Sequence, residues 1–470
     1  MNNTIVVEEA EILNNNTLSF NLSYPNRTKE YFKSDNIVFQ YDKEIASVDP
    51  SILQIPAVAT IIALAWALGS DVYVKTLDRT YLEALNKVKS VMKVWYPWFS
   101  FSTKINVDSI VTNRLHNNGY GVLFTGGIDS TTSYLRHKGK KPHLIAVWGT
   151  KRYVEPRIET VEKRLTDFAN KEGVKIHFVT TNFEKAINFD LLDENYGLEW
   201  WIHVFHSTVL TGISAPLTGV ENISTLLIAS SNTKKYNIPY GSHLYIDNKL
   251  KWADVQVVHD GSELTRQEKI RYVLKDHILK SGDYPFIRSC VCASGNNCGK
   301  CEKCFRTIAG LVLENINPNQ CGFNNVNAET FNLIKENVIK NLPQIQMNFV
   351  RTPFHKGGPK EALRTAIDGF SLEDFDDVGQ VSSTISRLTR IMNWTDIQEH
   401  IPEKLNHNLL GSKPFYDWFR TFDHRNAKKT EAMRFHLFGV LTYAYYHSPK
   451  NFRRSIKRSF LFSIYHRLIK

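Results

Sequence analysis

One segment of the chain combines glycines, hydroxyl groups and an acid in an order that suits polyphosphate binding. In the stretch LFTGGIDSTT, residues 123–132, an apolar run leads into Gly126 and Gly127. Paired glycines permit a tight turn with positive φ and let backbone amides approach an anion closely. Because a helix is expected to begin directly after them, its unpaired N–H groups and positive dipole end add to the attraction. The segment therefore predicts a loop that cradles phosphate groups.

The side chains around the glycines have separate roles in this prediction. We expect the hydroxyl groups of Thr125, Ser130 and Thr131 to donate hydrogen bonds to phosphate oxygens. Asp129 would repel a bare phosphate, so its expected role is to hold Mg²⁺ against a pyrophosphate. The loop is not of the Walker A type, because no Gly-Lys-Ser/Thr follows the glycines. The alternative is that an Asp or Ser merely caps a helix after a glycine turn.

A second segment carries closely spaced cysteines, since five of the six in the chain lie between Cys290 and Cys304. Such clustering is typical of metal binding in a reducing compartment. Cys298, Cys301 and Cys304 form two overlapping Cys-x-x-Cys steps that can share a tetrahedral Zn²⁺. We expect Cys290 to complete the site, with Cys292 as the competing ligand. Four protein ligands leave no open position, so the zinc would be structural; an iron–sulfur cluster is the main rival.

Buried strands alternate with helices over the region that must position these residues. The expected strands are Tyr120–Phe124, His143–Trp148, Lys175–Thr180 and Thr225–Ser230. The helices between them are expected to run through Leu135, over Pro156–Lys171 and over Trp200–Leu217. This alternation predicts the α/β class with a doubly wound parallel sheet, in which ligands bind at the carboxyl ends of the strands.

The chain is expected to divide into three regions. Residues 1–112 are predicted to be an N-terminal α/β domain, with its main helices at Pro56–Leu68 and Tyr81–Val94. Residues 113–325 form the expected domain of the phosphate loop, which includes a zinc knuckle at 288–306. Residues 326–470 are expected to be helical, with aromatic residues at helical spacing in the core and a basic tail at the end.

The chain's 58 Lys+Arg against 47 Asp+Glu give a net charge of +11 over 470 residues. Residues 449–470 hold seven of the basic residues and no acid, which leaves 51 against 47, or +4, elsewhere. Nucleic acid is therefore not a favoured partner of the body of the chain. The tail, with its interleaved aromatics, suits an anionic membrane surface or nucleic acid; the alternative is a solvated terminal helix.

Targeting and membrane segments are not expected. The first residues, MNNTIVVEEAEI, hold three glutamates and no basic run, unlike a signal peptide. The most apolar run, Ala57–Leu68, is too short to span a bilayer. We therefore expect a cytoplasmic protein with no transmembrane segment.

The loop resembles the Ser-Gly-Gly-x-Asp-Ser loop of the PP-loop ATP pyrophosphatases, with Thr125 in place of the first serine. Together with the later Cys-x7-Cys-x2-Cys-x2-Cys pattern, it resembles the 7-cyano-7-deazaguanine synthase family. Residues 148–155, WGTKRYVE, are similar to that family's Tyr-Gly-Gln-Arg-His stretch and its following Glu, and residues 261–269 to its Lys-bearing segment. The similarity covers about 121–313.

Two departures from the family bear on the substrate. The synthases have an Asp-rich stretch leading to Tyr-Pro-Asp after the fourth strand, whereas this chain has SSNT at 230–233 and YGSH at 240–243. The N- and C-terminal additions are also foreign to the compact synthases. The chain thus resembles a synthase-like relative with altered specificity, of the kind found in natural-product clusters and antiphage systems.

The resemblance implies an enzyme that uses ATP, Mg²⁺ and structural Zn²⁺ to convert a substrate carboxylate into its adenylate. It implies that Val147 and Trp148 border the adenine. Lys269 and Arg266 would offset the charge at the reacting phosphorus, although they could equally be ordinary surface charges of a helix. The expected substrate contacts are Arg152, Ser231, Ser242 and His243.

The expected partner is a small carboxylate or a protein that becomes modified, and we expect a homo-oligomer. Two other functions remain open: a tRNA-modifying thiolase or lysidine-type ligase, and a zinc-stabilised binding protein without catalysis. The weakly basic body and the lack of a further Cys-x-x-Cys argue against the thiolase. The intact Asp129 and Ser130 argue against the binding protein.

Overall fold

A computed structural model of the chain describes most of its first 326 residues. The described residues are 3–96, 98–150, 158–196, 200–231, 240–264, 266–290 and 295–299, with the positions 304, 307–308, 310–311, 314, 316–324 and 326. The expected substrate contact Arg152 and the expected zinc ligand Cys301 lie outside them, as do Cys292 and the helical region expected from residue 327 onward.

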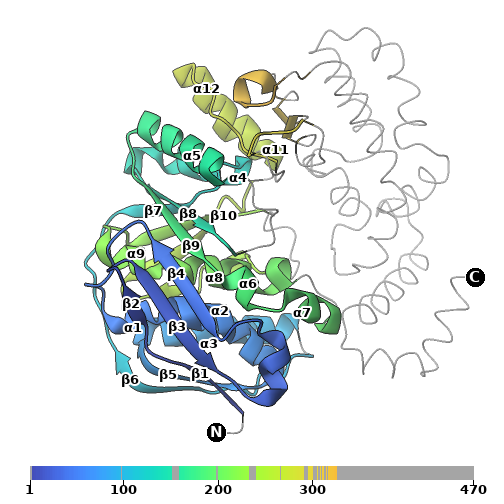
Figure 1. Cartoon of the computed structure of the whole chain (residues 1–470). Coiled ribbons are helices and arrows are strands. Elements are labelled where there is room, and N and C mark those ends of the chain that lie inside the picture. Colours follow the sequence, from blue (N-terminus) through green and yellow to red (C-terminus); the bar gives the residue numbers. More distant parts are fainter. Residues whose placement is uncertain are drawn as a thin grey trace, which may run out of the picture.

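The strands of the described residues belong to a single twelve-stranded sheet (Figure 1). Its order is β11-β12-β10-β7-β8-β9-β4-β3-β1-β5-β6, with β2 paired to β3 beside this path. The strands are β1 Thr4–Val7, β2 Glu11–Leu13, β3 Thr17–Ser23, β4 Asn36–Tyr41, β5 Asp71–Asp78, β6 Ile105–Val111, β7 Tyr120–Leu123, β8 His143–Trp148, β9 Ile176–Thr181, β10 Thr225–Ala229, β11 Lys251–Trp252 and β12 Val255–Asp260.

Five neighbouring strands, β12, β10, β7, β8 and β9, run parallel, and we call them the parallel block. Within it, β7 comes first in the sequence and lies in the middle. Strands β8 and β9 follow on one side of β7, and β10 and β12 on the other. Because the strand order reverses beside β7, the carboxyl ends there border a crevice of the type that binds ligands. The expected α/β class is confirmed, in a Rossmann-like arrangement.

Helices cover both faces of the sheet. They are α1 Pro50–Leu53, α2 Ile55–Leu68, α3 Arg79–Trp95, α4 Ile128–His137, α5 Ile158–Glu172, α6 Phe183–Ala186, α7 Phe189–Tyr196, α8 His206–Ile213, α9 Ala215–Val220, α10 Leu244–Asp247, α11 Arg266–Lys269 and α12 Lys275–Ser281. Successive residues of a strand point to opposite faces. Accordingly, Val122 packs in a core with α4 and α5, whereas Leu123 joins a core with α2 and α8 on the other face. Figure 1 shows these two helix layers on opposite sides of the parallel strands.

The four expected parallel strands are confirmed, each within one residue at its ends. The fifth, β12, is missing from the sequence-based expectation, because Gln256, His259 and Asp260 interrupt its apolar pattern. The helices expected at 56–68 and 81–94 correspond to α2 and α3.

The first 112 residues extend the sheet of the parallel block. Strand β4 pairs antiparallel with β9. Helix α2 is buried on nearly all sides and packs against α8, where a Cβ added to Gly212 would lie 2.3 Å from the Cβ of Ala59. Ile62 of α2 and Val209 of α8 belong to one core. The boundary expected at residue 112 therefore does not separate two hydrophobic cores. Among the described residues, every helix is too short or too polar to cross a lipid bilayer.

Candidate functional site

The glycine loop lies where β7 leads into α4. The backbone of Phe124, next after β7, donates to Ile145 O at 2.7 Å, so the loop begins at the carboxyl edge of the parallel block. Gly126 has a φ of +72°, and a Cβ built on it would lie 3.0 Å from Leu165 Cδ2. Gly127 is the N-cap residue of the ten-residue α4. Both the backbone conformation and the close approach of α5 therefore require a glycine at position 126.

The three hydroxyl residues of the loop have different surroundings. Ser130 Oγ lies 3.3 Å from Thr125 Oγ1 and donates to Gly127 O at 3.2 Å, so it closes the loop on itself. The side chain of Thr125 is exposed. Thr131 is fully buried, and its Oγ1 has no hydrogen-bond partner among the described residues. Of the three, Thr125 is the most accessible to a ligand on the loop.

Asp129 meets two cations from the short helix α11. Its Oδ2 accepts from Arg266 Nη2 at 2.8 Å, and its Oδ1 accepts from Lys269 Nζ at 3.2 Å. Lys269 also donates to the carbonyl oxygen of Ser230 at 2.5 Å and to its hydroxyl at 2.9 Å. The structure thus brings the four expected catalytic residues, Asp129, Ser130, Arg266 and Lys269, to the same edge of the sheet.

Burial and charge act in opposite directions on this cluster. Burial raises the pKa of Asp129, but Arg266 and Lys269 outweigh that effect and hold it well below the usual value. Burial lowers the pKa of Lys269, which is only 2% exposed, while the charge of Asp129 opposes that change. Asp129 is therefore a carboxylate at neutral pH. With two cations facing one anion beside a helix N-terminus, the local charge suits a polyphosphate.

The side chain of Asp260 holds the end of β12 against α4. The Oδ2 of Asp260, the last residue of β12, accepts from Ser133 Oγ at 2.8 Å, and its Oδ1 lies 3.1 Å from His137 Nε2. The next residue, Gly261, has a φ of +81°, and a Cβ there would lie 3.2 Å from Lys269 Cε. Gly261 therefore leaves room for the lysine stem. Local sequence patterns do not mark Ser230, Asp260 or Gly261 as site residues; the available signal is their place at the carboxyl ends of β10 and β12.

Arg288 covers the loop from the segment that leads into the cysteines. Its backbone N–H donates to Gly126 O at 2.7 Å, and its Nη1 donates to Thr125 O at 3.4 Å. Its guanidinium carbon lies 5.8 Å from the ring centroid of Trp148. This tertiary contact links the cysteine segment, the glycine loop and the end of β8. Nothing in the spacing of the sequence indicates it.

Trp148 and Val147, the expected adenine neighbours, end β8 beside the loop and are partly buried. Trp148 Nε1 donates to Glu162 Oε1 at 2.8 Å, which fixes the indole against α5.

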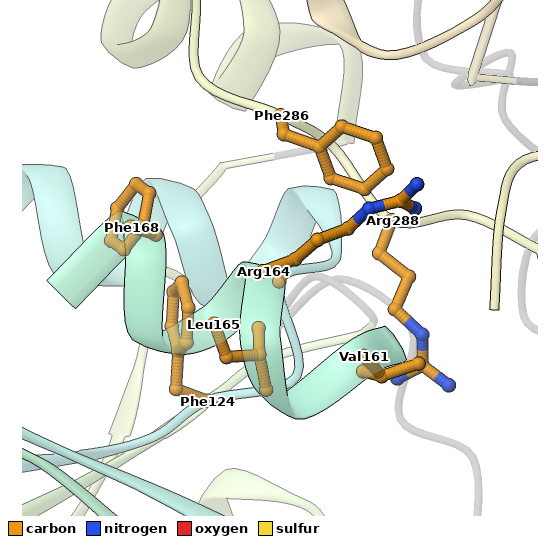
Figure 2. Close-up of a pocket in the computed structure, with 8 residues that line it drawn as sticks. Phe124, Val161, Arg164, Leu165, Phe168, Phe286 and Arg288 are labelled. Atoms are coloured by element: carbon orange, nitrogen blue, oxygen red, sulfur yellow. The ribbon is translucent and has the colours of Figure 1, made fainter. Parts of the chain in front are cut away.

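A small apolar pocket lies on the α5 side of the loop (Figure 2). In Figure 2 the phenyl ring of Phe286 and the side chain of Arg164 lie together, and the guanidinium carbon is 4.4 Å from the ring centroid.

Two expected substrate contacts belong to a separate, buried network. Ser242 Oγ donates to Asp247 Oδ2 at 2.8 Å, and the same oxygen lies 2.7 Å from His259 Nδ1. His243 is the N-cap of α10, where its Nδ1 accepts from Tyr245 N at 3.2 Å. Both Ser242 and His243 are at most 5% exposed. Ser231, another expected substrate contact, directly follows Ser230 and is partly exposed at the carboxyl edge.

Three of the expected zinc ligands come together. The Sγ atoms of Cys290, Cys298 and Cys304 lie within 4.8 Å of one another, and those of Cys298 and Cys304 are 4.0 Å apart. Thiolates bound to a tetrahedral Zn²⁺ at about 2.3 Å lie about 3.8 Å apart, so the three sulfurs fit such an ion. Asn297 shapes the turn by accepting from the backbone of Ser289 at 2.9 Å. Burial raises the pKa of Cys321, which lies outside the cluster, to about 12.

No protein-family model, curated protein or solved structure matches this chain. The described residues define a Rossmann-like α/β protein with a glycine loop at the strand-order reversal and a cysteine cluster next to it. Any function must therefore be inferred from the chemistry of these two sites.

Proposed function

We propose that the chain is an ATP-dependent adenylating ligase that resembles 7-cyano-7-deazaguanine synthase. It would activate the carboxylate of a deazapurine or a related substrate as an acyl-adenylate and release pyrophosphate and then AMP. The observation that carries this proposal is the meeting of Asp129, Arg266 and Lys269 at the glycine loop beside β7. Charged groups from α4 and α11, distant in sequence, surround a loop built for close anion approach.

The loop supplies the phosphate site in this proposal. The glycine pair leaves room for backbone amides to face phosphate oxygens, and the N-terminus of α4 adds its positive dipole end. Thr125 offers an exposed hydroxyl on the same loop. Walker A chemistry is not required, because Arg266 and Lys269 already provide the positive charge.

Asp129 would hold the Mg²⁺ that neutralises the leaving pyrophosphate. The carboxylate is ionised and partly exposed, which suits a hard cation with oxygen ligands. Arg266 and Lys269 donate hydrogen bonds to Asp129, and a bound phosphate would accept some of these hydrogen bonds instead. Because Lys269 also donates to Ser230, it would stay near the loop both with and without a bound phosphate.

The reaction has two displacements. In the first, a carboxylate oxygen of the substrate attacks the α-phosphorus of ATP, the bond to the pyrophosphate oxygen breaks, and an acyl-adenylate forms. In the second, an amine or ammonia attacks the acyl carbon, loses a proton and expels AMP. Arg266 and Lys269 offset the negative charge that builds on the phosphorus oxygens in the first step.

The cysteine cluster has an architectural role in the proposal. Cys290, Cys298 and Cys304, with Cys301, would hold Zn²⁺, and the donor set and sulfur spacing fit it. The segment that enters this cluster carries Arg288, whose backbone bonds to Gly126 O. Loss of the zinc would therefore weaken the contact between Arg288 and the phosphate loop.

Oxygen transfer from the substrate tests the adenylation step. The protein is mixed with Mg-ATP, ammonium and 7-carboxy-7-deazaguanine labelled with ¹⁸O in its carboxylate. The proposal expects pyrophosphate and AMP that carries one ¹⁸O atom, because the attacking oxygen stays on phosphorus when the acyl group leaves. Formation of ADP and phosphate would exclude adenylation. If neither occurs, the same assay with other carboxylic acids, including a protein carboxyl group, identifies the acceptor class.

A further inference from the structure

A second cluster of metal-ligating side chains lies at the amino edge of the parallel block, opposite the glycine loop. His143 is the first residue of β8, and His177 is the second of β9. Glu221 follows α9 and precedes β10. The strand register places Ile145 beside His177, so His143 and His177 share one face of the sheet. None of the three takes part in the proposed ligase reaction.

The three side chains converge at distances that suit a small cation. His143 Nδ1 lies 3.1 Å from His177 Nε2 and 3.6 Å from Glu221 Oε2. His177 Nε2 lies 3.7 Å from Glu221 Oε1. Ligands of a tetrahedral Zn²⁺ at about 2.0–2.1 Å lie about 3.4 Å from one another. The two histidines meet different oxygens of Glu221, and one ligand atom from each of the three residues lies within 4.8 Å of the other two, so a small turn of the side chains brings them to one ion.

Burial and charge distinguish the cluster from a surface group of acids. The side chain of His177 is 0% exposed, that of Glu221 is 9% exposed and that of His143 is 17% exposed. Lys175 donates to Glu221 Oε2 at 2.8 Å, which leaves Oε1 directed at His177. A cation could therefore enter past His143 and meet an ionised carboxylate with one oxygen available.

The outer nitrogen of His177 provides an independent observation. His177 Nδ1 is buried without a hydrogen-bond partner among the described residues, and it lies 3.5 Å from Asp42 Oδ1. A histidine that binds a metal through one nitrogen commonly directs the other at a carboxylate, which fixes the tautomer. Asp42 follows β4, so this contact joins the antiparallel strands to the parallel block.

A hydrogen bond between the two imidazoles explains part of this geometry. The rings are 15° from parallel with centroids 5.4 Å apart, so their nitrogens point nearly at each other. The hydrogen bond by itself gives no reason for Glu221 to face both nitrogens or for Asp42 to face the outer nitrogen of His177. For both rings to bind one ion, each must turn, and the shared proton must pass to solvent.

We propose that His143, His177 and Glu221 bind one Zn²⁺ ion, with water in the fourth position. The ion ties the amino ends of β8 and β9 to the turn before β10. Its binding replaces the proton between the imidazoles, so no redox change is involved. This site is separate from the cysteine cluster and does not depend on the ligase proposal.

Metal content and cobalt spectra test the proposal on the full chain. After dialysis against ZnCl₂ and removal of free metal, His143→Gln and Glu221→Gln should each bind one zinc per chain fewer than the unsubstituted protein. Lys175→Gln is the matched control, because it alters the same network without removing a ligand, and it should keep the zinc. With Co²⁺, Cys298→Ser should lose the sulfur-to-cobalt charge-transfer band and retain the weaker spectrum of a nitrogen–oxygen site.

If His143→Gln and Glu221→Gln hold as much zinc as the unsubstituted protein and Lys175→Gln, the proposal is overturned. Anomalous diffraction at the zinc edge, from crystals of the unsubstituted protein soaked in ZnCl₂, gives a second test that does not depend on a variant folding. A peak among the three side chains supports the site, and its absence overturns it. Neither result bears on AMP formation, so failure here is distinct from failure of the ligase proposal.

Discussion

The two edges of the parallel block carry opposite kinds of side chains. At the carboxyl edge, Arg266 and Lys269 surround a glycine loop at the start of α4. At the amino edge, two imidazoles face Glu221, and Asp42 lies behind them. The first arrangement suits an anion, and the second suits a cation.

The topology accounts for this difference. In a doubly wound sheet each helix begins where a strand ends, so helix N-termini gather at the carboxyl edge and helix C-termini at the amino edge. The positive ends of the helix dipoles therefore favour anions at the carboxyl edge, and the negative ends favour cations at the other. α4 begins directly after the loop, and α9 ends one residue before Glu221. The side chains strengthen a polarity that the backbone already has.

Removal of the acid at the carboxyl edge should have the largest effect. Asp129→Asn keeps the size of the side chain but removes its charge, so the proposed Mg²⁺ contact and the charged partner of Arg266 and Lys269 are both lost. AMP formation should fall about 100- to 1,000-fold. The measurement is single-turnover AMP release. Glu263→Gln is the control, because Glu263 pairs with Arg136 near the same cluster and is half exposed; its rate should be unchanged, and equal losses in both variants would contradict the assigned role.

A methyl group added at Gly126 should weaken nucleotide binding more than it lowers the stability of the fold. Gly126→Ala forces an L residue to a φ of +72° and brings its Cβ to 3.0 Å from Leu165 Cδ2. The free loop can relieve this strain of about 1–2 kcal/mol by leaving the binding conformation, and bound ATP must restore that conformation, so the KM for ATP should rise about tenfold. Gly139→Ala, where a Cβ meets nothing within 4 Å, is the control and should leave the KM unchanged. The loop assignment fails if both variants have the KM of the unsubstituted protein.

A substitution in the core shared by α2 and α8 should change the stability of the fold but not the activity. Gly212→Ala places a Cβ 2.3 Å from that of Ala59 at the contact of α8 with α2. Overpacking should lower the free energy of unfolding by about 1–3 kcal/mol, more than the gain of about 1 kcal/mol in helix propensity. Urea unfolding measures the loss, and the activity of the folded protein should be unchanged. A variant with unaltered stability would show that the two helices do not pack this closely.

Acid titration should reveal the ion pair at the carboxyl edge through a smaller effect. Burial raises the pKa of Asp129, but its two cations hold the value below that of the unfolded chain, so the ionised form stabilises the fold at neutral pH. This contribution is complete above the unfolded pKa of about 3.9 and is lost as the pH falls further. The difference in unfolding free energy between the unsubstituted protein and Asp129→Asn should therefore shrink below about pH 4. A difference that stays constant through this range would contradict the pairing.

Local patterns in the sequence predict four of the five strands of the parallel block and the position of its loop, because each of these strands is a short apolar run and the glycines lie directly after one. They do not predict β12, since polar residues interrupt its apolar pattern and serve other contacts, such as that of Asp260 with Ser133 of α4. They also do not predict that β4 continues the sheet, because its pairing with β9 joins segments far apart in the chain. Arg288 and His177 are likewise identified only by tertiary contacts.

A crystal soaked with Mg²⁺ and α,β-methylene ATP tests the central claim most directly. We predict density for the triphosphate over residues 126–130, with Mg²⁺ on Asp129 and with Arg266 or Lys269 against phosphate oxygens. Density for the nucleotide elsewhere, or a loop that remains closed by side chains at saturating nucleotide, would contradict the claim that this glycine pair binds ATP.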